Sequence, residues 1–203
     1  MHHHFSHAFR TALRTSTRFM LLSILFAGAA GAQEKNRFSL EIDPATYALG
    51  GYAAHLRMTM PALPAWRFGI GAYALDFPDL FVDMNPDNKD EGWDVRLDSG
   101  IGLFAEFTPG GKDRGWFAGG QVAVQRFRVG NEQEGTAQAE FSTLLLMIHT
   151  GYRWFPSDSG LYLQPWAGLG YAGKISGETQ VGSRTYAVSP VVPFMTLHLG
   201  YIF

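Results

Sequence analysis

The chain has 203 residues, with 16 basic and 18 acidic side chains, a formal net charge of −2 and no cysteine. This balance gives no basic footprint for nucleic acid, and the lack of cysteine excludes a disulfide framework and thiol catalysis. The length corresponds to a single domain.

The first 32 residues have the organisation of a secretory signal peptide. Three arginines and no acid precede an apolar segment, which ends on Ala-Gly-Ala at 30–32. This A-x-A-like end predicts cleavage before Gln33. The apolar run is about 14 residues, fewer than the roughly 20 that a spanning helix needs, although an uncleaved anchor is the alternative. We expect a cleaved leader over 1–32 and a mature domain over 33–203 with a net charge of −5, because three bases and no acid leave with the leader.

Period-two alternation after the leader predicts eight antiparallel strands. Each has an apolar face and a face of polar residues or glycine, and Pro, Gly or Asp mark the turns between them. Asp43-Pro44 interrupts the first strand and Pro165 interrupts the seventh. The pattern predicts an all-β fold, an eight-stranded antiparallel up-and-down transmembrane β-barrel. The predicted strands cover 37–43, 46–60, 66–77, 93–107, 115–128, 140–155, 161–173 and 191–203.

The fourth predicted strand alternates most clearly. Its apolar face is expected to point outward, toward lipid, and its polar face inward. The outward residues are Trp93, Val95, Leu97, Ile101 and Leu103, and the inward ones include Asp94, Arg96, Asp98 and Glu106.

The connections alternate in length. Short turns at 61–65, 108–114 and 156–160 are predicted to be periplasmic, and longer polar loops at 78–92, 129–139 and 174–190 are predicted to lie outside, as in membrane barrels. Aromatic residues are expected to form two girdles at the bilayer interfaces. The predicted periplasmic girdle is Trp66, Phe107, Trp116, Trp154, Phe155, Tyr201 and Phe203, and the outer one is Phe77, Trp93, Phe127, Phe141 and Tyr171.

The inward faces carry four acids and four arginines. An eight-stranded barrel is just wide enough for its side chains to fill, and isolated charges inside it would be costly. We therefore predict a lumen largely plugged by ion pairs, with a small cavity beside the inward glycines as the alternative. The charged residues of this predicted network are Glu41, Arg57, Arg67, Asp94, Arg96, Asp98, Glu106 and Arg153. Its expected neutral members are Tyr73, Gln121, Gln125, Tyr162 and Gln164.

Three histidines, His55, His149 and His198, are also expected inside. They are interpreted as structural polar-core residues, and the alternative is a metal or proton-relay site.

Acidic residues cluster in the loop 78–92, and the candidate cation ligands among them are Asp83, Asp87 and Asp90. The cluster is interpreted as a solvated loop, because no glycine occupies the position that a calcium loop requires, and a weak divalent-cation site is the alternative.

The last strand is apolar on one face and small or polar on the other, and the chain ends on an aromatic residue. This ending resembles the C-terminal assembly signal of bacterial outer-membrane barrel proteins, with Leu199, Tyr201 and Phe203 as its residues. The resemblance implies the barrel-assembly machinery as a partner.

The leader, the strand number and this ending together resemble the small eight-stranded outer-membrane barrels of the OmpA, OmpX and OmpW type. The resemblance implies integral location in the outer membrane of a Gram-negative bacterium, with membrane lipids and lipopolysaccharide as partners. The predicted role is structural or one of surface interaction, without a cofactor. The alternatives are a narrow channel or binder for a small apolar solute or ion, and a lipid-modifying enzyme. The enzyme is disfavoured because the Gly-x-Ser-x-Gly pattern is absent and neither His149 nor His198 begins a His-x-Ser pattern.

Overall fold

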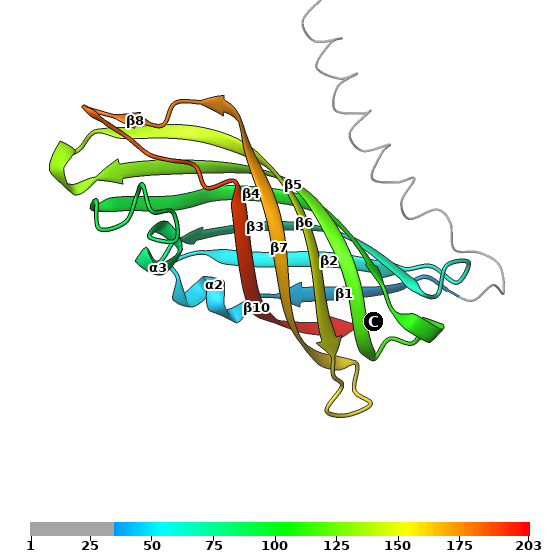
Figure 1. The fold of residues 1–203 in the computed structure, drawn as a ribbon. Helices are drawn as coiled ribbons and strands as arrows, with labels where there is room; N and C mark the ends of the chain where they lie inside the picture. The colour runs from blue at the N-terminus through cyan, green and yellow to red at the C-terminus, as the bar shows by residue number, and fades with distance from the viewer. Residues whose placement is uncertain (1–34) are drawn as a thin grey trace, which may run out of the picture. The chain divides into compact units, whose positions relative to one another are not determined.

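A computed structural model describes residues 35–203, which form eight strands closed into one antiparallel barrel (Figure 1). Neighbouring strands of the chain pair with one another, and the first pairs with the last. The predicted eight-stranded antiparallel up-and-down barrel is therefore confirmed, while the predicted leader and its cleavage site lie outside the described residues. The barrel strands are β1 (Arg37–Ile42), β2 (Tyr52–Thr59), β3 (Trp66–Asp76), β4 (Trp93–Phe107), β5 (Gly115–Asn131), β6 (Gln138–Arg153), β7 (Leu161–Gly177) and β10 (Val191–Ile202).

The two ends of the barrel differ. Short connections, one of them with the 3-10 helix η1 (Pro109–Gly111), lie at the end that holds the C-terminus, which we call the turn end. The opposite, loop end carries helix α3 (Asp79–Val82), the 3-10 helix η2 (Glu132–Glu134) and a hairpin of β8 (Gln180–Val181) and β9 (Arg184–Thr185). No helix in residues 35–203 is long and apolar enough to cross a membrane.

The strand predicted over 46–60 is wrong in its first part. Pro44–Ala48 form helix α2, and β2 begins only at Tyr52. Asp43 caps this helix, because its carboxylate accepts a 2.9 Å hydrogen bond from the N–H of Ala45. The proline that follows occupies the first helical position, where its missing N–H costs nothing.

Helix α2 lies in the barrel wall where a strand pairing is missing. β10 pairs with β7 from Val191 onward, but with β1 only from Leu199 onward, because β1 ends at Ile42. Among the described residues, Val191–His198 of β10 therefore have no strand on their second side. Helix α2 packs there against β2 and β10 (Figure 1). We call this gap between β2 and Val191–His198 the seam.

A break in the strand register reverses the faces of β4, which has one extra residue relative to both of its neighbours, β3 and β5. The β4–β5 register shifts between Leu97 and Ser99, and the β3–β4 register shifts between Tyr73 and Leu75. A shift of one residue sends all later side chains to the opposite face. The fourth strand is therefore corrected at its loop end. Trp93, Val95 and Leu97 are buried inside rather than outside, and Asp94, Arg96 and Asp98 lie on the opposite, outer face.

The outer girdle prediction is also wrong for four of its five aromatic residues. Trp93, Phe127 and Phe141 are buried in the interior cluster and Phe77 packs against it, whereas Tyr171 is exposed. The predicted periplasmic girdle differs from the outer one, because Trp66, Trp116 and other aromatic residues near the turn end are exposed on the wall. Between the turn-end aromatic residues and the level of Tyr171, the wall carries exposed aliphatic side chains, which include Ile70, Ile101, Leu103, Leu146, Ile148, Leu169, Met195 and Leu197.

Candidate functional site

Two glutamates and three arginines meet inside the turn-end half of the barrel. Glu41 comes from β1 and Glu106 from β4, while Arg57, Arg67 and Arg153 come from β2, β3 and β6. Alternation directs all five inward, and each is at most 4% exposed. We call these five residues the charge network.

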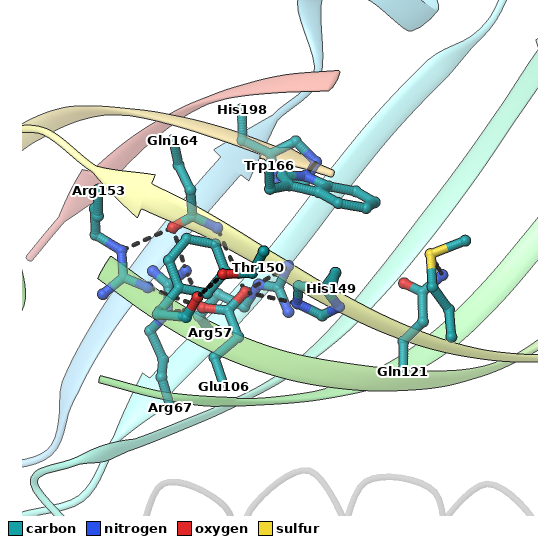
Figure 2. Close-up of polar contacts among 12 residues, drawn as sticks. Arg57, Arg67, Glu106, Gln121, His149, Thr150, Arg153, Gln164, Trp166 and His198 are labelled. Carbon is teal, nitrogen blue, oxygen red and sulfur yellow. Dashed lines mark hydrogen bonds and ion pairs between the residues drawn. The ribbon is translucent and has the colours of Figure 1, made fainter. Parts of the chain in front are cut away.

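Arg67 is the centre of the charge network (Figure 2). Its guanidinium donates to Glu41 at 2.6 Å and to Glu106 at 2.7 Å and 3.0 Å. It also donates to the hydroxyl of Tyr162 at 2.9 Å and to the amide oxygen of Gln164 at 2.8 Å. Arg67 thus connects β1, β3, β4 and β7 across the lumen.

The other two arginines extend the charge network to the remaining wall. Arg57 donates to Glu41 at 3.0 Å and lies 4.2 Å from the ring centroid of Phe104, a cation–π contact. Arg153 donates to Glu106 at 2.8 Å and to Gln164 at 2.7 Å. Because the hydrogen bonds are charge-assisted and mutual, they offset the cost of burying charges.

The structure brings together five of the eight charged residues that alternation assigned to the lumen. The other three lie on the outer wall beyond the break in β4. There Arg96 pairs with Asp76, and Asp98 pairs with Arg128. Of the expected neutral members, Tyr162 and Gln164 join the charge network, while the Gln125 amide donates to the Tyr73 hydroxyl at 3.2 Å, nearer the loop end.

The three histidines do not converge on one point. The His55 and His198 rings are neighbours, with centroids 4.7 Å apart. Trp166 lies between His149 and His198. Its ring centroid is 5.2 Å from that of His149 and 5.6 Å from that of His198. His149 instead points toward Glu106, with Nε2 3.7 Å from the carboxylate.

A different triad, Glu41, His55 and His198, has ligand atoms within 4.8 Å of one another. Two of its members already have other partners. His198 Nδ1 lies 3.1 Å from Glu41, and its Nε2 accepts a 3.1 Å hydrogen bond from the Trp166 indole. Within residues 35–203, neither nitrogen of buried His55 has a hydrogen-bond partner. A cation here would have to displace arginine from Glu41, so the arrangement favours a structural role.

The acidic loop is held by asparagines. Buried Asn88 donates to the Ala187 carbonyl and accepts from the Ala187 N–H, each at 2.9 Å. Within residues 35–203, Asp83, Asp87 and Asp90 do not form a group with metal-ligand spacing. The loop therefore docks on residues 178–190 through the side-chain amide of Asn88. The clustering of acidic residues did not indicate this contact.

The loop-end half has an apolar interior. The indole of Trp93 meets the ring of Tyr186 edge-on at 5.4 Å, and Phe127 stacks on Phe141 at 5.1 Å. Val82 of α3 and Val181 of β8 cover this cluster. Burial raises the pKa of Tyr186 to about 12, so its hydroxyl stays neutral.

An apolar cavity lies between the charge network and this cover. It consists of two adjoining spaces of about 70 Å³ and about 80 Å³. Each exceeds the roughly 10–15 Å³ that one water molecule needs. His55, His198, Trp166 and Gln121 line the first space toward the charge network. Residues that line both spaces are Leu75, Phe77, Gln125, Val192 and Phe194.

No protein-family model matches the chain, and no curated protein matches it. Among solved structures, it is similar to neisserial surface protein A, at 13% identity and a TM-score of 0.47, covering 82% of this chain and 94% of that one. It is also similar to a major outer membrane protein from Thermus thermophilus, at 15% identity and a TM-score of 0.47, covering 84% of this chain and 100% of that one. At these values neither likeness carries an argument. The eight-stranded closed barrel is shown by the strand pairing of this chain itself.

Proposed function

We propose that the chain is an integral barrel of the outer membrane of a Gram-negative bacterium, with a closed lumen and a structural or surface-interaction role. Its wall supports this location, because exposed aliphatic residues surround a polar interior in the turn-end half. The signal-like sequence over 1–32 and the ending Leu199-Gly200-Tyr201-Ile202-Phe203 agree with export and barrel assembly. Short turns on the periplasmic side would place the loop end at the cell surface.

The charge network is the observation that carries the proposed closed lumen. Its five charged side chains are buried and bond to one another from opposite sides of the barrel. A path for ions along the axis would require these bonds to open. An eight-stranded barrel leaves little space around such a cluster.

The outer wall supports the proposed surface role. Arg126 pairs with Glu140, and Arg128 pairs with Asp98, all on exposed or half-exposed positions beyond the aliphatic wall. Arginine suits the phosphate groups of lipopolysaccharide. The proposed partners at this level are therefore lipopolysaccharide headgroups, with the docked loops as the contact surface.

Conductance in a planar bilayer tests the closed lumen. We expect no discrete conductance from the refolded wild type, a leak from Arg67→Ala, and no leak from Arg96→Ala on the outer wall. Steady conductance of the wild type would establish a channel instead. Release of fatty acid from outer-membrane lipid by the purified protein would replace the proposal with an enzymatic role.

The cavity supports a second candidate function, the binding of a small apolar molecule. Its lining is mainly aliphatic and aromatic, with a few polar groups that include the carboxylate of Asp43, which is the usual composition of a small-molecule site. Ala53 lines this cavity and is buried, while its neighbour Ala54 is exposed on the wall. Ala53→Phe is expected to abolish binding of an apolar probe, and Ala54→Phe is expected to preserve it.

A further inference from the structure

We propose that a single acyl chain enters the cavity sideways from the membrane, through the seam between β2 and β10, and that α2 is the movable lid. The proposal rests on the second candidate function, binding in the cavity, and adds the ligand class and the route of entry.

The cavity runs along the inner side of the free edge of β10. Val192 and Phe194 belong to Val191–His198, the segment without a strand on its second side, and both line the two spaces. Asp43 and Thr46, at the start of α2, line the first space from the other side of the seam. Among residues 35–203, α2 and its flanking residues therefore cover the cavity at the seam.

The exterior of the seam is suited to lipid. The exposed residues of α2 are Pro44, Ala45, Tyr47 and Ala48, none of which is charged. On the other side, β10 exposes Val191, Met195 and Leu197. A water-soluble ligand would have no polar path across this surface, whereas a hydrocarbon tail can cross it without losing hydration.

The lid is fastened to β10 by few bonds. The Thr196 hydroxyl donates to the Asp43 carboxylate at 2.6 Å, and Asp43 is otherwise occupied with capping α2. A five-residue helix has little stability of its own. Exchange of the Thr196 contact for another partner would let α2 move while the eight strands stay paired.

The interior favours the tail of an amphiphile over its charged head. Toward the charge network the cavity is lined by the uncharged amide of Gln121 and by the ring of His55, whose nitrogens have no hydrogen-bond partner within residues 35–203. Arg57 does not line the cavity and is bonded to Glu41. Elsewhere the lining consists largely of aromatic and aliphatic side chains such as Phe77 and Leu145. We therefore expect tail-first insertion, with the polar head left at the seam.

Fluorescence of Trp166, which lines the cavity, tests the binding step. The other four tryptophans are replaced by phenylalanine, and the refolded protein is placed in bilayers. One arm adds a brominated fatty acid to ordinary phospholipid, and the second uses brominated phospholipid alone. In the arm whose brominated molecule supplies the acyl chain, we expect strong quenching of Trp166 fluorescence. Ala53→Phe is expected to remove this quenching, and Ala54→Phe is expected to preserve it. Equal quenching of the two variants in both arms would show that the cavity takes no acyl chain.

A covalent bridge across the seam tests the route. The chain has no cysteine, so Asp43→Cys with Thr196→Cys gives the only thiol pair, which a short bifunctional thiol reagent can join. The double variant without the thiol reagent is the control for the loss of the Asp43 contacts to Ala45 and Thr196. We expect Trp166 fluorescence to be quenched before the two thiols are joined and not to be quenched afterwards. Quenching that persists at the same rate after joining, but still disappears with Ala53→Phe, would overturn the lateral route and leave binding intact.

Discussion

The two halves of this barrel are built from the same strands but place polar and apolar side chains on opposite faces. In the turn-end half, charged side chains fill the interior and aliphatic ones cover the wall. In the loop-end half, aromatic side chains fill the interior while arginines and acids pair on the wall. The first arrangement suits a surrounding of lipid, and the second suits a surrounding of water.

In β4 the change from one half to the other occurs at a register break. Above the break in β4, Val95 and Leu97 point inward, and below it Glu106 does. One extra residue is enough, because alternation has a period of two. A strand can thus continue from membrane into water without its sequence changing from apolar to polar overall.

The largest expected effect comes from breaking the charge network. Arg67→Met would leave Glu41 and Glu106 with fewer partners in a buried site, and we expect a loss of about 3–5 kcal/mol in the free energy of unfolding. Arg96→Met, on the outer wall of the other half, is expected to cost about 0–1 kcal/mol. Urea unfolding in lipid measures both. Equal losses would contradict the difference between the two interiors.

A charge on the wall gives the next largest effect. Leu146 is 53% exposed on the aliphatic wall, and Leu146→Arg near mid-bilayer is expected to cost about 2–4 kcal/mol. The reverse change in the other half, Arg126→Leu, removes one exposed ion pair and is expected to leave the urea midpoint nearly unchanged. An unchanged urea midpoint for Leu146→Arg would show that this wall does not face lipid.

Docking of the loops gives a smaller, local effect. Asn88→Ala would leave the Ala187 backbone without two hydrogen bonds, at a cost of about 1–3 kcal/mol. We expect faster protease cleavage within 78–92 and 178–190 but unchanged strand content. Exposed Asp87→Ala in the same loop is the control. Similar cleavage of both variants would mean that Asn88 does not hold the loops together.

The smallest effect is a pH dependence of the β8–β9 hairpin. The Ser183 hydroxyl and N–H donate to Glu134 and hold the pKa of that carboxyl below its usual value. Its contribution to stability is therefore complete above the ordinary glutamate pKa of about 4.3, and it is lost as the pH falls through the lowered folded value. The protection of amides 180–185, measured as the exchange rate relative to the intrinsic rate at each pH, is expected to fall on acidification, and Glu134→Gln should remove this dependence.

Alternation alone predicts most of this fold. The strand over 93–107 has the predicted bounds, and the other strands differ mainly near the loop end. The break in β4 was not predictable, because Trp93 to Phe107 alternates without a visible interruption. The helix α2 was missed although Asp43-Pro44 carries its start signal, since the same pair also fits an interrupted strand.

The interior site was predictable to a similar extent. Alternation assigns Glu41 and Arg67 to the lumen, but not which atoms meet, since that depends on the stagger of the strands. The separation of His149 from His55 and the cavity under the loops follow from side-chain packing between strands far apart in the chain. A single sequence does not specify such packing.

The short pairing of β1 with β10 has a consequence for the order of local opening. The amides of β10 between Val191 and His198 that point toward the seam lack a partner strand among the described residues, whereas those of β5 and β6 are paired along nearly their whole length. Amide exchange with deuterium should therefore begin at β10 and β1 and reach β5 and β6 last. The barrel would then open, and during assembly close, along this one line.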